Sequence, residues 1–359
     1  MRLIESLHIE AFRGLRDLRL EGLGQINLLV GPNNCGKTSV LESIDFLQSL
    51  WGVVDFVMVG SARRQHTGLS HFEGLRWLFP QGRDGRIKLA VAGEWPLAEA
   101  QATLAVFAEV AEEAMVGAAG DGGVGPANGR ERQGAEVAVA VTARGLGELA
   151  VTHRVVQGAP LRQELPLPMP ESLAVRVEFT TPADVADEEY TRDRYSRLPA
   201  AQRKAVCELV RRFDPLVEDI AVVIPPEKQP VLLVEHGRLG RPPLSTFGDG
   251  LRRAVQLASA VSSAAGGLLL VDEIENSLHP SALATVFGWL VAACREHDVQ
   301  LFATTHSLEA LDAMVGAVGG QVDDLVAYHL APRLERTHAE RFSGDMLQRL
   351  VRERGLDVR

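Results

Sequence analysis

The sequence predicts an α/β fold: a mixed sheet with antiparallel N-terminal strands and flanking helices, plus an inserted α+β or helical lobe. An apolar run at 25–30 precedes a glycine-rich segment at 31–38, and apolar residues at helical spacing follow over 39–50. Two further apolar runs, 267–275 and 299–306, end in polar residues. Buried parallel strands read as continuous apolar runs, and such sheets bind ligands beyond the carboxyl ends of their strands. One sheet with one site at its edge is therefore expected.

Length and composition limit the classes of protein that the chain can represent. Its 359 residues allow one large or two ordinary domains, and 46% hydrophobic with 23% charged residues is typical of a globular protein. We see no apolar run long enough for a membrane span and no signal peptide, and three cysteines suit a reducing cytosol. A cytoplasmic protein without membrane contact is expected. The net charge of −10 argues against a globally basic nucleic-acid binder but allows a local basic groove.

The segment 31–38 fits the phosphate-binding pattern G-x-x-x-x-G-K-[ST]. Its glycines let backbone N–H groups turn inward around phosphate oxygens, and the following helix N-terminus adds partial positive charge. Lys37 would reach the β- and γ-phosphates, and the Thr38 hydroxyl would hold Mg²⁺. A chance glycine turn is the alternative, against which the flanking strand and helix argue. The predicted nucleotide-binding residues here are Gly31, Pro32, Asn33, Asn34, Cys35, Gly36, Lys37, Thr38 and Ser39.

The first residues predict two more strands, at 3–9 and 17–21, with Arg13 in the turn between them. The strings 9–15 and 27–42 resemble the opening of SMC-type ATPases, and most closely the ATPase half of the OLD (overcoming lysogenization defect) family. This resemblance implies an ABC/SMC-type P-loop head that binds and hydrolyses ATP. It also implies that Arg13 contacts the nucleotide; a solvated turn arginine is an equally open alternative.

The middle of the chain is expected to be an inserted lobe, 51–239, between two parts of the ATPase core, 1–50 and 240–359. An alanine-rich segment at 97–117 predicts a helix, and a flexible glycine-rich loop is expected near 118–135. A single segment without sustained heptads cannot build the coiled-coil arms of SMC proteins. Strands are expected at 86–92, 136–142, 148–156 and 173–179.

A basic segment at 191–212 can be interpreted in two ways. Its arginines and Lys204 could form a nucleic-acid or partner surface. Its apolar residues at helical spacing instead favour a solvated amphipathic helix, which is the reading preferred here. Nucleic acid is kept as a possible partner.

The segment 244–253 resembles the signature motif of ABC and SMC ATPases, where a serine and a glycine at a helix N-terminus bind the γ-phosphate held by a partner protomer. This version is longer than the transporter form, so the signature hydroxyl can belong to either of two side chains. A simple helix cap is the alternative. The candidate residues are Ser245, Thr246, Gly248 and Gly250.

The apolar run at 267–271 delivers Asp272 and Glu273 to the expected ligand crevice. Adjacent carboxylates at a strand end are costly unless a cation or a water network uses them. Asp272 would hold the Mg²⁺ shell, and Glu273 would orient or deprotonate the attacking water. The following segment 276–280 resembles the D-loop, which crosses to the other protomer, and His306 resembles the switch histidine that contacts the γ-phosphate.

Together these resemblances imply a homodimer or higher homo-oligomer that sandwiches ATP and Mg²⁺, with Lys37, Glu273 and His306 as catalytic residues. OLD nucleases continue into a Toprim nuclease domain, which we do not find in this chain. We therefore expect a nucleotide-driven switch that regulates a separately encoded effector, a nuclease, in bacterial anti-phage defence. The alternative is an SMC-like DNA-binding ATPase in DNA repair or chromosome maintenance. A transporter's nucleotide-binding domain is a third reading, against which the long insertion and the signature count.

Overall fold

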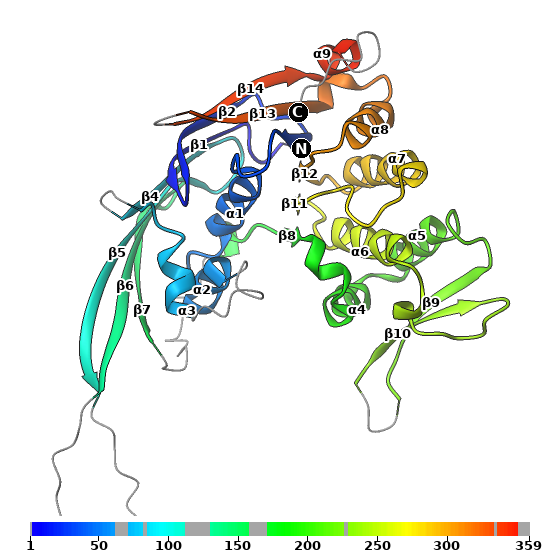
Figure 1. Cartoon of the computed structure of the whole chain (residues 1–359), viewed down its shortest axis with the longest axis horizontal. Coiled ribbons are helices and arrows are strands. Elements are labelled where there is room, and N and C mark those ends of the chain that lie inside the picture. The colour runs from blue at the N-terminus through cyan, green and yellow to red at the C-terminus, as the bar shows by residue number, and fades with distance from the viewer. Residues whose placement is uncertain are drawn as a thin grey trace, which may run out of the picture.

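The framework of the molecule consists of two six-stranded sheets and a two-stranded hairpin (Figure 1). These elements come from a computed structural model that describes residues 2–61, 71–81, 85–111, 130–157, 171–225, 229–333 and 336–350. No helix within those ranges is both long enough and apolar enough to cross a membrane.

The first sheet is antiparallel, in the order β2-β1-β4-β5-β6-β7. Leu7, Ile9 and Phe12 are buried where β1 meets the first helix. Its long strands β5 and β6 form the arm at the lower left of Figure 1. The strands are β1 (Ser6–Phe12), β2 (Leu15–Glu21), β4 (Arg86–Ala92), β5 (Leu97–Ala111), β6 (Arg130–Ala143) and β7 (Gly147–Val156).

The helix predicted over 97–117 is wrong for 97–111, which is strand β5. Ala100 and Ala102 are buried and pair with Val141 and Val139 of β6, while polar residues alternate with them. Helix propensity is a weak prior, and this period-two pattern lets β5 bury one face in a sheet. The predicted loop is also wrong at 130–135, where β6 begins. The rest of these two predictions, 112–129, lies outside the described residues.

The second sheet has the order β14-β13-β3-β12-β11-β8. All of its strands run parallel except β14, which is antiparallel to β13. Every residue of β3, β11 and β12 is buried, as the continuous apolar runs predicted. The strands are β3 (Ile26–Val30), β8 (Val177–Thr180), β11 (Leu268–Val271), β12 (Gln300–Thr304), β13 (Leu325–Arg333) and β14 (Arg336–Ser343).

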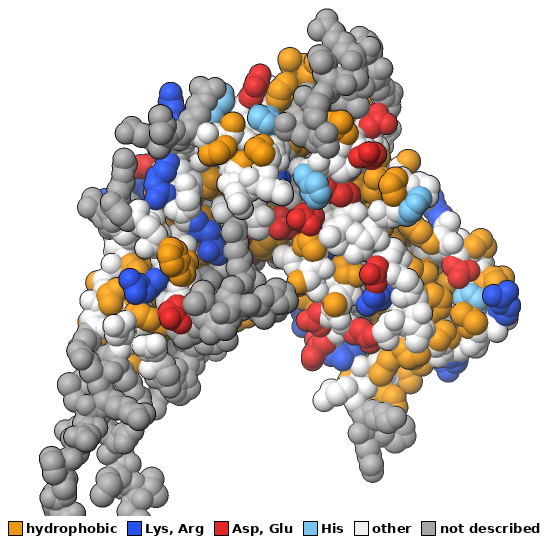
Figure 2. Space-filling view, viewed as in Figure 1, with side chains coloured by type: hydrophobic (Ala, Val, Ile, Leu, Met, Phe, Trp, Pro, Cys, Tyr) orange, Lys and Arg blue, Asp and Glu red, His pale blue; other side chains and the backbone are white. Residues whose placement is uncertain are grey.

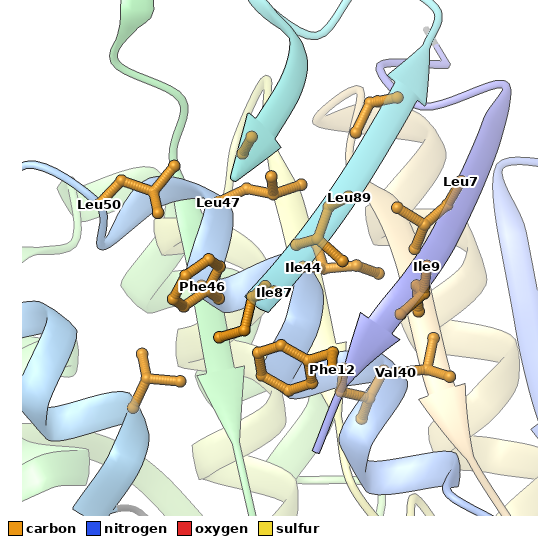
Figure 3. Packing of buried hydrophobic residues seen from close by; sticks show 14 of the residues in the cluster. Leu7, Ile9, Phe12, Val40, Ile44, Phe46, Leu47, Leu50, Ile87 and Leu89 are labelled. Atoms are coloured by element: carbon orange, nitrogen blue, oxygen red, sulfur yellow. The ribbon is translucent and has the colours of Figure 1, made fainter. Parts of the chain in front are cut away.

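Helices cover both faces of this sheet. Helix α1 (Lys37–Gln48) packs against the first sheet, where Val40, Ile44 and Phe46 contact the apolar side chains of β1 and β4 (Figure 3). Helices α6, α7 and α8 enclose a second apolar core on the opposite face (Figure 1). The bounds of these three are Asp249–Ser263, Pro280–Glu296 and Leu308–Val318.

The remaining helices and the hairpin surround this framework. Two helices follow α1 and two more precede the hairpin of β9 and β10. Strand β14 leads into the short helix α9, and residues beyond 350 lie outside the described ones. The bounds are α2 (Val53–Ser61), α3 (His71–Arg76), α4 (Glu188–Arg197), α5 (Ala200–Val210), β9 (Val217–Val223), β10 (Val231–His236) and α9 (Gly344–Gln348).

The expected inserted lobe, 51–239, does not separate cleanly from the two expected core segments. Strand β4 pairs with β1, so β4 to β7 extend the N-terminal sheet. Strand β8 pairs in parallel with β11 at the edge of the core sheet. Strand β8 has only four residues, and nothing in their sequence indicates that they join the core sheet. Only α4, α5, β9 and β10 gather at one side, around α6.

Candidate functional site

The phosphate-binding segment forms the tight turn that its pattern predicted. Gly31 and Gly36 have φ of +136° and +100°, and Asn34 also adopts the left-handed conformation, with φ of +62°. A Cβ atom on Gly31 would lie 2.5 Å from the Leu330 carbonyl oxygen, so only glycine fits there. Helix α1 begins directly at Lys37. Its N-terminal N–H groups and the loop amides are thus available to an anion.

Two side chains after the loop point toward its own carbonyls and toward β11. The Nζ of Lys37 donates to the carbonyl oxygens of Gly31 and Pro32, at 2.7 and 3.0 Å. The Oγ1 of Thr38 donates to the Asp272 carboxylate, with oxygen–oxygen distances of 3.0 and 3.1 Å. The residues predicted to hold phosphate and metal therefore lie together, although 234 positions separate Thr38 from Asp272.

Thr304, at the end of β12, connects the two acidic residues and was missed by the sequence reasoning. Its Oγ1 donates to Asp272 Oδ1 at 2.7 Å and accepts from the Glu273 N–H at 2.8 Å. Glu273 has φ of +47°, a conformation that a non-glycine residue holds only when its surroundings fix it. The only sequence signal for Thr304 was its place at the end of a buried strand near His306.

Arg253 of α6 contacts the backbone of Asp272 and Glu273, and the sequence analysis also missed it as a site residue. Its side chain is fully buried and donates to the carbonyl oxygens of Asp272 and Glu273, both at 3.3 Å. It also donates to Gln256 Oε1 at 2.9 Å. Burial lowers the pKa of this guanidinium to about 10, so it is still charged at neutral pH. An arginine four residues into an amphipathic helix gives no sequence sign of burial.

His306 lies just beyond β12 and is paired with Glu275. Its Nδ1 is 3.2 Å from Glu275 Oε1, and its backbone N–H donates to the same oxygen at 3.1 Å. The imidazole is 57% exposed, whereas the Glu275 side chain is only 12% exposed. The acid thus fixes the ring at the wall of the crevice, where more than half of the His306 side chain is exposed.

Arg13 lines the same crevice, but its guanidinium is engaged with protein groups. Its Nε lies 2.7 Å from Oε2 of Glu42, a carboxylate on α1 that is almost fully buried. Its Nη2 also donates to the Val59 carbonyl oxygen at 3.3 Å. The reading as a solvated turn arginine is wrong, because the Arg13 side chain is only 10% exposed. Its contact with nucleotide remains a prediction.

These groups surround one cavity of about 900 Å³. Acidic and histidine side chains gather over the ends of β11 and β12 on the face seen in Figure 2. Gly31 and Pro32 lie in an adjoining hollow that also includes Asn33 and His306. The predicted residues that line the main cavity are Arg13, Asn33, Asn34, Cys35, Gly36, Lys37, Thr38, Ser39, Asp272, Glu273 and His306.

The signature residues do not line this cavity. Ser245 and Thr246 form an exposed 3₁₀ turn before α6, with Gly248 as the N-cap residue and Gly250 in the first turn of the helix. The Thr246 hydroxyl donates to the Pro243 carbonyl oxygen at 2.7 Å. In the described part of the chain the Ser245 hydroxyl has no hydrogen-bond partner. The helix-cap alternative receives no support, because no side chain caps α6.

The basic segment 191–212 forms two helices, α4 and α5, and three of its arginines bond within the protein. Arg192 pairs with Glu189 and Asp193, and Arg194 pairs with Glu178. Arg211 donates to the Val217 carbonyl oxygen. This favours the amphipathic-helix interpretation over a nucleic-acid surface.

Two protein-family models match the chain. "AAA ATPase domain" matches residues 1–56, and "AAA domain, putative AbiEii toxin, Type IV TA system" matches residues 156–312. The second match begins before β8, so it includes part of the expected insertion together with the core. The unmatched residues between them contain most of the long antiparallel arm.

Among curated proteins, the similarity is confined to short segments. The uncharacterized proteins MJECL10 and MJECL11 of Methanocaldococcus jannaschii are 47% and 37% identical over 58 and 69 residues, 16% and 19% of this chain. An "ATP/GTP phosphatase" of Helicobacter pylori is 32% identical over 75 residues, 20% of this chain. These segments span 26%, 60% and 20% of the three relatives, respectively.

Among solved structures, SMC heads share the fold over nearly the whole chain. A head bound to the C-winged helix domain of ScpA has a TM-score of 0.53 at 13% identity, covering 95% of this chain and 98% of that one. A head with an extended coiled coil, bound to the C-terminal domain of ScpA from Pyrococcus furiosus, has a TM-score of 0.52 at 11% identity, covering 98% and 99%. The chain therefore has the fold of an SMC-type head, and two ATPase-domain models match parts of its sequence. The predicted fold class is confirmed.

Proposed function

We propose that the protein binds and hydrolyses ATP at the crevice between the phosphate-binding loop and the end of β11. The bond network that joins Thr38, Asp272, Thr304 and Glu273 is the observation that supports this proposal most directly. It joins the hydroxyls of Thr38 and Thr304 to the Asp272 carboxylate near the start of α1, and Glu273 lines the same cavity. Loop amides and Lys37 would bind the β- and γ-phosphates, and Glu273 would orient or deprotonate the attacking water.

Mg²⁺ suits the donor set of this site. Within the described ranges no three acidic, histidine or cysteine side chains cluster to hold a metal. Mg²⁺ commonly keeps several waters and binds through one or two protein oxygens together with substrate phosphates. Thr38 and Asp272 would supply those oxygens, and the ion when bound would neutralise charge on the phosphates. His306, held by Glu275, would contact the γ-phosphate.

We further propose that two copies complete the site. The signature residues lie outside the nucleotide cavity of their own chain, and Ser245 presents an exposed hydroxyl near the N-terminus of α6. A partner's α6 could bring this hydroxyl and the helix N-terminus to the γ-phosphate. Closure of a homodimer would then depend on ATP, and hydrolysis would reopen it.

The decisive experiment is the native mass of the Glu273→Gln variant with and without ATP. Doubling of the mass with ATP, lost when Ser245→Ala or Thr246→Ala is added, would support the composite site. A mass indifferent to ATP would contradict it. Gel filtration of each variant without nucleotide controls for altered folding.

As its biological use, we propose that this switch is an OLD-like ATPase that regulates a separately encoded nuclease in cytoplasmic anti-phage defence. The match to a family model described as "putative AbiEii toxin, Type IV TA system" supports this use. Cleavage of DNA with Mg²⁺ by the purified protein alone would contradict it. The second candidate, an SMC-like DNA-binding ATPase in repair or chromosome maintenance, is supported by the shared SMC-head fold. It would show DNA-stimulated hydrolysis with steep salt dependence.

A further inference from the structure

One aromatic side chain in the wall of the nucleotide cavity has no part in the phosphate chemistry. Trp77, just after α3, lines the same cavity as Lys37 and Asp272. It is 56% exposed, whereas Trp51 and Trp95 are 9% and 1% exposed. An indole left in water beside a ligand cavity forgoes the burial that large aromatic side chains usually gain. A ligand that covers the ring would recover that free energy.

The chain around Trp77 is held firmly. Its N–H donates to the Gly74 carbonyl oxygen at 3.2 Å, and the next residue, Leu78, accepts from the Arg13 N–H at 2.8 Å. Leu78 and Phe79 are also buried, so packing and the hydrogen bond to Arg13 together fix the turn that follows Trp77. A ring presented by a fixed turn loses little conformational entropy when a ligand packs on it.

The chemistry of the cavity wall around the ring indicates which part of a nucleotide it meets. The triphosphate end is assigned to Gly36, Lys37 and Thr38 at the start of α1. A cavity of about 900 Å³ has room for a whole nucleotide. The side chains of Trp77, Phe79 and Gln81 in its wall are uncharged, and the neighbouring guanidinium of Arg13 is already paired with Glu42. This part of the wall is therefore suited to the base end rather than to phosphate.

We propose that Trp77 is the base platform of this site and stacks on the nucleobase of the bound nucleoside triphosphate. The inference rests on the proposed nucleotide-binding function and adds the subsite that distinguishes a nucleotide from a bare triphosphate. Every base has a π-face, so stacking strengthens binding of ATP and GTP alike. Arg13 contributes by fixing the turn through its backbone N–H.

The test compares ATP, GTP and inorganic tripolyphosphate as ligands of the wild-type chain and of Trp77→Ala, Trp77→Phe and Leu146→Ala. Leu146 is also about half exposed, but it lies in the turn between β6 and β7 and lines no part of the cavity. Calorimetry with Mg²⁺ gives each dissociation constant, and thermal unfolding without ligand shows that each variant folds.

For Trp77→Ala we expect affinity for ATP and GTP to fall about ten-fold, with tripolyphosphate unchanged, since stacking on an aromatic ring contributes about 1–3 kcal/mol per base. Trp77→Phe should retain most of the affinity, and Leu146→Ala all of it. An equal loss for all three ligands, or no loss for any, would overturn the role of Trp77 alone. A wild-type chain that binds neither ATP nor tripolyphosphate would instead overturn the proposed function and the base platform with it.

Discussion

The two faces of this chain that we propose to bind phosphate differ in how extensively hydrogen bonds fix their residues. The face at the start of α1 is interlocked, because a chain of hydrogen bonds joins Thr38 of α1 to Asp272 and Glu273 at the end of β11 and to Thr304 at the end of β12. The face at the start of α6 is an exposed turn with Ser245 outward, outside the cavity. The first face can contact a nucleotide in the cavity of its own chain. The second lies outside that cavity and could contact only a nucleotide held by another chain.

Arg253 connects these two faces physically. It belongs to α6, four residues beyond its first residue, yet it bonds to the backbone of Asp272 and Glu273. A shift of α6 when a partner binds would therefore reach the segment that carries Glu273.

Among variants of the interlocked face, Glu273→Gln should have the largest effect on turnover. The amide is nearly the same size but cannot accept a proton, so we expect turnover to fall by about 10²- to 10⁴-fold while ATP binding is retained. Steady-state hydrolysis and calorimetric binding measure the two effects. Turnover at the wild-type rate would remove Glu273 from its role.

Lys37→Ala tests whether the same face binds phosphate by charge. Loss of a hydrogen bond to a charged group should weaken ATP binding by about 10- to 150-fold, measured as a dissociation constant. Lys88→Ala is the matched control, since Lys88 pairs with Glu10 and Glu99 on the first sheet, away from the cavity. Equal losses in both variants would point to general charge rather than to this site.

The exposed face is tested by comparing Ser245→Ala with Thr246→Ala. Thr246 already donates to the Pro243 carbonyl oxygen, so we expect Ser245 to supply the contact with the partner. Its removal should weaken ATP-dependent association about ten-fold, while Thr246→Ala has little effect. Sedimentation equilibrium of both variants in the Glu273→Gln background measures the ATP-dependent association. The reverse ranking would assign the signature hydroxyl to Thr246.

A moderate effect is also expected for Thr304→Val, which keeps the shape of the side chain and removes its hydroxyl. Asp272 and the Glu273 N–H each lose a partner, so turnover should fall about five- to thirty-fold, with ATP binding less affected. Thr304→Ser should restore turnover, because it restores the hydroxyl. Failure of the serine variant to recover would mean that packing, not hydrogen bonding, explains the loss.

Local signals made much of the site predictable. The pattern over 31–38 requires glycine at positions with positive φ, and the apolar runs before Asp272 and His306 require burial in a parallel sheet. By contrast, the alanine-rich segment 97–111 was predicted as helix from propensity and is a strand. Its neighbours β4 and β6 decide that outcome, because pairing on both sides outweighs a weak intrinsic preference.

The sequence by itself determined the motifs, the class of nucleotide site and the strand type of its buried runs, because each depends on residues close together along the chain. Only the tertiary structure decided that β8 joins the core sheet, that Arg253 is buried beneath Glu273 and that Arg13 pairs with Glu42. Those contacts join residues far apart in sequence. Which distant groups meet is set by how sheets and helices pack, and no local pattern records it.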